Sequence, residues 1–90
     1  MTLEQILAHG YLQPRRVNGI WYALYPFNFT CGLVAGLEDH GYQRRYCYEH
    51  QDDAEKALRE FNGEGHPGGQ WIKCKGIGID LLNPAIGKLF

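Results

Sequence analysis

Hydrophobic and polar residues change their period near the middle of the chain. Tyrosine or arginine occupies every second position from Tyr42 to Tyr48, which is the period of two that a β-strand produces. From Asp52 the apolar positions follow the spacing of an amphipathic helix, and Asn62-Gly63 supplies a stop. Asp52 and Glu55 form a capping-box pattern, which predicts Asp52 as the N-cap. The pattern predicts a tyrosine-rich strand that leads into a helix.

The segments before this strand also have clear patterns. A capping box predicts a short helix from Thr2 to His9. Asn18-Gly19 is a turn pattern, and if it closes a hairpin then Gln13 to Val17 pairs with Ile20 to Tyr25. The Ile20 to Tyr25 run is rich in β-forming residues and predicts a strand, and Thr30 to Leu37 predicts the next one.

A glycine-rich loop follows the second helix and leads to a fourth alternating run. Trp71 to Lys75 predicts a strand at the sheet edge, where Lys73 and Lys75 point outward and protect that edge. No clear period continues beyond Gly76. Residues 76–90 are therefore predicted to form an extended tail that packs over an apolar groove or binds a partner.

Together these elements predict an α+β fold in the order α-β-β-β-α-β. A three- to four-stranded antiparallel sheet packs against one or two short helices, within a single domain over residues 1–90. One face of the sheet is expected to pack on the helices, and the other is expected to remain open for binding.

Composition narrows the class of protein. The 90 residues are 44% hydrophobic and carry a net charge of -1, which indicates a folded domain and weighs against a strongly electrostatic nucleic-acid binder. Local basic clusters are still compatible with this total. No run approaches the ~20 apolar residues of a membrane helix, so we expect a soluble cytoplasmic protein without membrane association. Six Tyr and two Trp favour either a core of large rings or an interface.

Metal and catalytic sites are poorly supported. The three cysteines are too widely spaced for a disulfide scaffold, and reduced thiols fit better. A zinc site would need Cys47, His50, His66 and Cys74 to converge, and the short C-x-x-C spacing is missing. The chain has no serine, and its cysteines lie in apolar strands where a thiol stays protonated. We therefore predict no enzymatic activity, no metal and no cofactor.

A binding surface is the better-supported site. If Arg44 shares the open face with the tyrosines of its strand, the resulting surface stacks bases, holds phosphates or anchors a protein. The alternative is that the charges are solvated and the tyrosines belong to the core. Loops present contact groups, which adds residues of the two aromatic loops. The predicted binding residues are Tyr42, Arg44, Tyr46, Tyr48, Trp21, Phe27, Phe29, His66 and Trp71.

Four pieces of the chain also resemble a group of small proteins encoded by bacteria and their phages. The pieces are Trp21 in the first strand, the FNFTCGL corner from Phe27, the GYQRRYCY strand from Gly41, and the HPGGQWIKCKG segment from His66. The resemblance spans Gly19 to Gly76 and implies a mobile-element gene. Many small proteins of that kind inhibit host defences such as CRISPR–Cas.

The predicted topology is also similar to that of sheet-based nucleic-acid-binding domains. Three strands followed by a helix resemble the plant ethylene-response DNA-binding domain and integrase arm-binding domains, which read DNA through several Arg and Trp. The helix–three strands–helix order resembles double-stranded-RNA-binding domains, but Asp52-Asp53 stands where those have lysines. These similarities concern the fold alone.

The sequence therefore predicts a non-enzymatic macromolecule-binding protein. The sharpest version is an inhibitor that occludes a bacterial defence complex, with a host protein or ribonucleoprotein complex as its partner. The runner-up is a nucleic-acid-binding module that uses its sheet face. A monomer and a two-fold homodimer are both compatible with the pattern. The runner-up would use Arg15, Arg16, Arg44, Lys73 and Lys75.

Overall fold

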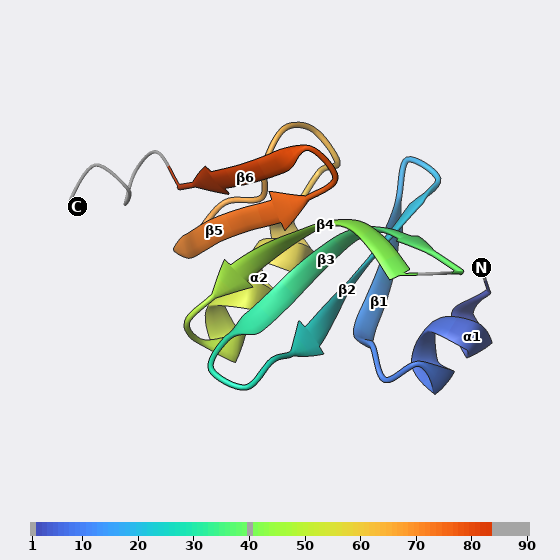
Figure 1. The fold of residues 1–90 in the computed structure, drawn as a ribbon. Helices are drawn as coiled ribbons and strands as arrows, with labels where there is room; N and C mark the ends of the chain where they lie inside the picture. The colour runs from blue at the N-terminus through green and yellow to red at the C-terminus, as the bar shows by residue number, and fades with distance from the viewer. Residues whose placement is uncertain (1, 40, 84–90) are drawn as a thin grey trace.

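The structure, a computed structural model, describes residues 2–39 and 41–83. These residues form one antiparallel sheet of six strands and two short helices, α1 (Leu3–Ala8) and α2 (Gln51–Glu60) (Figure 1). Each strand pairs with its neighbours in sequence. One antiparallel sheet packed with two short helices confirms the α+β class. The strands are β1 (Leu12–Val17), β2 (Ile20–Pro26), β3 (Cys31–Glu38), β4 (Gly41–Tyr48), β5 (Trp71–Gly76) and β6 (Ile79–Leu82).

The first hairpin forms as the turn pattern predicted. Asn18 and Gly19 both have positive φ angles, of 52° and 79°, which is the backbone that a two-residue turn between twisted strands requires. Val17 pairs with Ile20 and Arg16 with Trp21 across this turn. β1 is therefore a full member of the sheet, which has six strands rather than three or four.

The predicted tail begins with a strand instead. β6 pairs with β5 through a turn in which Gly78 has a φ of 71°. β5 consequently has a neighbour on both sides, and the prediction that it forms the edge of the sheet was wrong. The short length of β6, four residues, explains why no period was visible in the sequence. Residues 84–90 of the predicted tail lie outside the described residues.

The two helices lie on opposite faces of the sheet, which contradicts the expectation of one covered and one open face. On the α2 face, Ala54 and Leu58 pack against a cluster that includes Leu24, Leu33 and Tyr46. On the α1 face, Ile6 packs against a second cluster with Ala23, Val34 and Leu37. α1 is only six residues long, so it covers one part of its face and leaves the rest to other side chains.

The ends of α2 differ from the predicted ones. The helix begins at Gln51 after His50, whose side chain makes no capping hydrogen bond, so Asp52 is not the N-cap. Asp52 and Asp53 lie in the first turn instead, where the positive end of the helix dipole favours carboxylates. The dipole therefore accounts for the acidic pair without a capping box.

Arg15 holds the other end of α2 against the sheet. Its Nη1 donates to the carbonyl oxygens of Leu58 and Phe61, at 2.5 and 2.6 Å. Carbonyls at a helix C-terminus have no partner within the helix, and a cation there also complements the dipole. Arg15 is therefore a structural residue, with its guanidinium engaged at the end of α2.

Candidate functional site

Tyr46 and Tyr48 are core residues rather than surface contacts. Both side chains are 0% exposed and pack beneath α2. The Tyr46 hydroxyl lies 2.7 Å from His66 Nδ1, and the Tyr48 hydroxyl donates to the Gly68 carbonyl at 2.7 Å. Burial raises the pKa of both tyrosines above its ordinary value. Their face of β4 is covered because α2 follows directly and folds back over it.

Trp71 was also wrongly placed on the surface. It is 3% exposed, and its Nε1 donates to the Pro67 carbonyl at 2.8 Å. A register shift where β4 meets β5 inserts an extra residue, which turns both Trp71 and Cys74 into the core. His66 stays exposed, although its ring is held by Tyr46. The His66 to Trp71 loop is therefore anchored to the core.

Arg44 and Tyr42 do not lie side by side. Arg44 is half-buried on the α2 face, with its Cζ 5.8 Å from the ring centroid of Tyr46. Tyr42 packs with the α1-face cluster, together with its cross-strand neighbour Leu37. The change of face accompanies Gly36 in β3, whose φ of 73° departs from regular strand geometry. The tyrosine–arginine surface predicted from alternation is therefore not formed.

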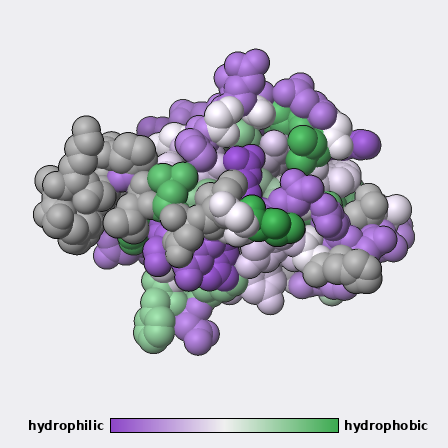
Figure 2. All heavy atoms as spheres, turned by 45° about the horizontal axis from the view of Figure 1, so that its top comes forward, coloured by the Kyte–Doolittle hydropathy of each residue, from purple (hydrophilic) through white to green (hydrophobic). Residues whose placement is uncertain are grey.

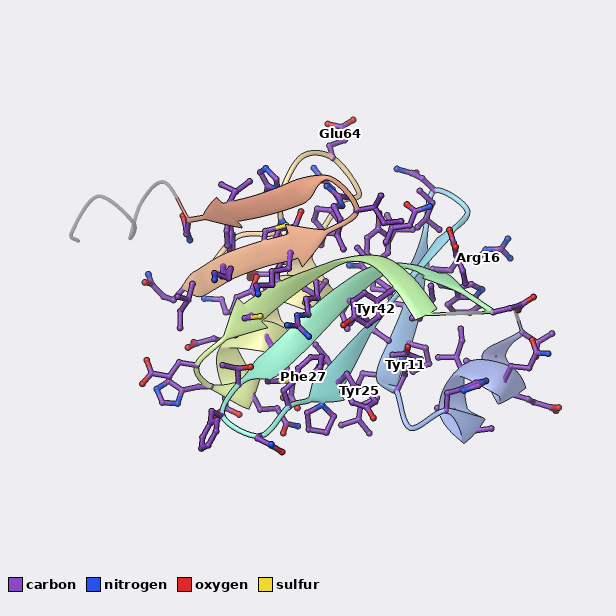
Figure 3. The ribbon with its side chains drawn as sticks, in the orientation of Figure 1. Tyr11, Arg16, Tyr25, Phe27, Tyr42 and Glu64 are labelled. Atoms are coloured by element: carbon purple, nitrogen blue, oxygen red, sulfur yellow. The ribbon has the colours of Figure 1, made fainter. Side chains whose placement is uncertain are left out.

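A different aromatic surface lies on the α1 face. Five half-buried rings gather there, and we call them the aromatic face. Tyr25 links its neighbours, with centroid distances of 5.3 Å to Tyr11 and 5.3 Å to Phe27. Figure 3 shows four of the rings toward the viewer, whereas α2 lies behind the sheet. The aromatic face consists of Tyr11, Trp21, Tyr25, Phe27 and Tyr42.

Arg45 occupies a central position among these rings. Its Cζ lies 4.7 Å from the ring centroid of Phe27, and its Nη1 donates to the Tyr42 hydroxyl at 3.3 Å. That hydrogen bond raises the pKa of the guanidinium, which therefore stays charged. The Arg45 Nε is buried and has no hydrogen-bond partner in the described part of the chain. Gly32 makes room for the Phe27 ring, since a Cβ there would lie 2.4 Å from the ring.

Strand register adds further cations to the same face. Lys75 stands directly opposite Arg45, and Lys73 opposite Cys47, so all four residues share one side of the sheet. Arg16 lies at the other end of the face, with its Cζ 5.7 Å from the Trp21 ring centroid. Sequence reasoning missed Arg45 because Arg44 and Arg45 are adjacent on a strand and point to opposite faces of the sheet. The sequence does not show which of these faces α2 covers.

Phe29 is the most exposed of the predicted contact residues. Its side chain is 92% exposed on the loop between β2 and β3. A hydrogen bond of 2.8 Å from the Phe27 amide to the Thr30 carbonyl closes this loop. Phe29 therefore stands in solvent on a defined turn beside the aromatic face. Figure 2 shows that hydrophobic side chains in its view form small separate patches among hydrophilic ones.

A groove on the α2 side is acidic. It has a volume of about 520 Å³ and lies between α2 and the loop that follows it. Asp53 and Glu60 line it from the helix and Glu64 from the loop, with Lys56 as the nearby cation. Glu64 is labelled in Figure 3, on the loop above the sheet. Three carboxylates and one lysine thus line this groove.

The described residues contain no group of three or more His, Cys, Asp or Glu side chains close enough to hold a metal ion. All three cysteines are free thiols. Cys31 and Cys74 are buried, and burial raises the pKa of both thiols. Cys47 is half-buried on the α1 face.

We expect thiol reagents to distinguish these cysteines in the folded protein. Only the thiolate reacts, so Cys31 and Cys74 are protected by both burial and raised pKa, and Cys47 reacts first. With dithionitrobenzoate at pH 8, one thiol of the folded protein should react rapidly. All three thiols should react once the protein is denatured. Cys47→Ala should remove the rapid phase. Rapid reaction of either remaining thiol in that variant would contradict the burial seen here.

The chain matches no protein-family model, no curated protein and no solved structure. None of the described helices is long and apolar enough to span a membrane.

Proposed function

We propose that this protein is a non-enzymatic macromolecule-binding protein that acts by steric occlusion, and that its target is a bacterial defence complex. The observation that carries the proposal is the half-exposed aromatic face, with Arg45 among its rings and Phe29 beside it. Aromatic and arginine side chains supply most of the energy of protein interfaces. Their concentration in one place favours a contact surface.

Phe29 is the strongest single candidate for an anchor in a protein partner. A phenylalanine that is 92% exposed contributes little to the folded core, because almost none of its surface leaves water on folding. Burial of such a side chain in a partner would contribute about 1.5–3 kcal/mol. The closed loop also lowers the entropy cost of binding, since the backbone that carries the ring is already held in a defined turn.

The defence-complex part of the proposal rests on the resemblance of the chain to small proteins encoded by bacteria and their phages. The FNFTCGL corner from Phe27, which resembles the corner of small phage-encoded proteins, includes Phe29 itself. The same motif thus links the resemblance to an exposed contact group. A host protein or ribonucleoprotein complex is the partner that this proposal requires.

Phe29→Ala should weaken partner binding at least tenfold without changing stability. The measurement is phage plating on a host with an active CRISPR–Cas system that targets the phage, with the protein or a variant expressed. The wild-type protein should restore plaques, and Phe29→Ala should restore fewer, because loss of ~1.5–3 kcal/mol of burial lowers affinity by a factor of roughly 10 to 100.

Ile77→Ala is the matched control. Ile77 is 83% exposed but lies on the turn between β5 and β6, away from the β2–β3 loop. It should behave as the wild-type protein does. Failure of the wild-type protein to restore plaques against this defence would remove CRISPR–Cas as the target. Equal losses in the two variants would remove Phe29 as the anchor.

A further inference from the structure

We infer that the aromatic face binds single-stranded nucleic acid, with bases against its rings and phosphates on Arg16, Arg45 and Lys75. The inference deepens the proposed function and rests on its assignment of the aromatic face as the binding surface. It names the chemistry that this surface recognises, which a ribonucleoprotein target would present. Three observations carry it: the cations on the aromatic-face side of β4 and β5, their spacing, and the half-buried guanidinium of Arg45 among the rings.

Cations gather on the aromatic-face side of β4 and β5. Register places Arg45, Lys73 and Lys75 there, on the side opposite α2. Glu38 lines a hollow with Arg16 at the other end of this face and accepts a hydrogen bond from Gln43. The three cations on β4 and β5 therefore form a basic track beside the rings.

The spacing of the cations suits a polyanion laid across the strands. Arg45 and Lys75 are on adjacent strands, about 4.8 Å apart, and Arg16 lies three strands from Arg45, or roughly 14 Å away. Register sets Trp21 beside Arg16 on β2, whereas Tyr25 and Phe27 lie farther along the chain, past the level of Arg45. Proteins that bind single strands combine such a cationic track with aromatic rings on which successive bases stack.

Arg45 itself has an unsatisfied donor. Its Nη1 is satisfied by Tyr42, but its buried Nε has no acceptor in the described residues. A guanidinium usually satisfies its donors with carboxylate, phosphate or backbone oxygen, and an unpaired buried one costs free energy. Arg45 as a whole is only half-buried, so its other N–H donors are the ones that a phosphate oxygen or the edge of an unpaired base would meet. The guanidinium over Phe27 is also a plane on which a base stacks.

The half-buried rings favour an unpaired strand over a duplex. Bases inside a double helix are stacked on each other and cannot reach rings that lie within a sheet face. A twelve-nucleotide strand falls within the site sizes of roughly 4–16 nucleotides that are usual for such surfaces. The probes are therefore fluorescein-labelled dT12 and U12, with a labelled GC-rich twelve-base-pair duplex beside them.

Fluorescence anisotropy of these probes with the full chain is the test. We expect a measurable Kd for at least one single strand at 50 mM salt, weaker binding of the duplex, and a Kd that rises roughly 20-fold between 50 and 200 mM salt, as three phosphate contacts imply. Arg16→Gln and Lys75→Gln should each weaken binding roughly eightfold at 50 mM salt and flatten the salt dependence. Tyr25→Leu should weaken binding at least roughly fivefold and leave the salt dependence unchanged.

Lys56→Gln is the matched control, because it removes the same charge from the α2 side. It should bind as the wild-type protein does, with circular dichroism confirming that every variant is folded. The inference is overturned if no single strand binds at 50 mM salt, if the duplex binds more tightly, or if Lys56→Gln is as damaging as Lys75→Gln. Equal affinity for a twelve-residue polyglutamate would also overturn it and identify an acidic protein surface as the partner.

These outcomes separate the inference from the proposed function. Plaque restoration that depends on Phe29, without oligonucleotide binding, overturns the nucleic-acid inference alone. Oligonucleotide binding that depends on Lys75, without plaque restoration, overturns the defence-complex target alone.

Discussion

Replacement of Tyr46 by alanine lowers the free energy of unfolding by about 3–5 kcal/mol, the usual cost of removing a large buried ring. Tyr46 is 0% exposed and packs against the rings of Trp71 and His66, at centroid distances of 5.2 and 5.6 Å. Alanine leaves a cavity beneath α2 that these neighbours cannot fill without moving. Urea denaturation followed by circular dichroism measures the change.

Tyr46→Phe is the control for this experiment. It keeps the ring and removes only the hydroxyl that contacts His66, so it should cost about 1 kcal/mol. If Tyr46→Ala instead left stability unchanged and abolished partner binding, Tyr46 would be a surface contact and the placement of α2 over β4 would be wrong.

Arg15→Met should lower the free energy of unfolding by about 2–4 kcal/mol, because hydrogen bonds from a charged donor to the Leu58 and Phe61 carbonyls are lost and those acceptors stay partly buried. The adjacent Arg16 provides a control of identical chemistry. It is exposed and lies over the Trp21 ring, so Arg16→Met should cost less than about 1 kcal/mol.

Thermal denaturation of the two variants compares the neighbours directly. Arg15→Met should melt well below Arg16→Met. The reverse order, or equal melting temperatures, would show that Arg15 does not hold the end of α2. Arg16→Met should weaken oligonucleotide binding more than Arg15→Met does, because Arg16 lies on the aromatic face and Arg15 does not.

Local patterns in the sequence predicted most of the secondary structure. Asn18-Gly19 predicted its hairpin because two adjacent positive φ angles are a local requirement that these residues satisfy. The capping box of Thr2 and Gln5 is present, with both reciprocal hydrogen bonds. The change from period two to a helical period correctly marked the passage from β4 to α2. Each of these features depends on residues a few positions apart.

The candidate site could not be predicted because it depends on which face of the sheet α2 covers. Alternation correctly separated Arg44 from Arg45, but the choice of outward residue is made by a helix packed from elsewhere in the chain. The insertion that buries Trp71 and the positive φ of Gly36 each break alternation without a distinctive residue pattern. β6 is too short to show a period at all.

The sequential strand order has a consequence for how the chain reaches its native state. Every strand pairs only with the strands next to it in sequence, and β1 to β4 are joined by short connections. Closing a short connection costs little chain entropy, so these four strands can assemble while the rest of the polypeptide is still unfolded or unmade. The longest closure brings β5 back to β4 after α2, and it also buries Tyr46 and Tyr48. Until that closure, the future core is exposed to water, and this interval is when the chain is most prone to aggregate.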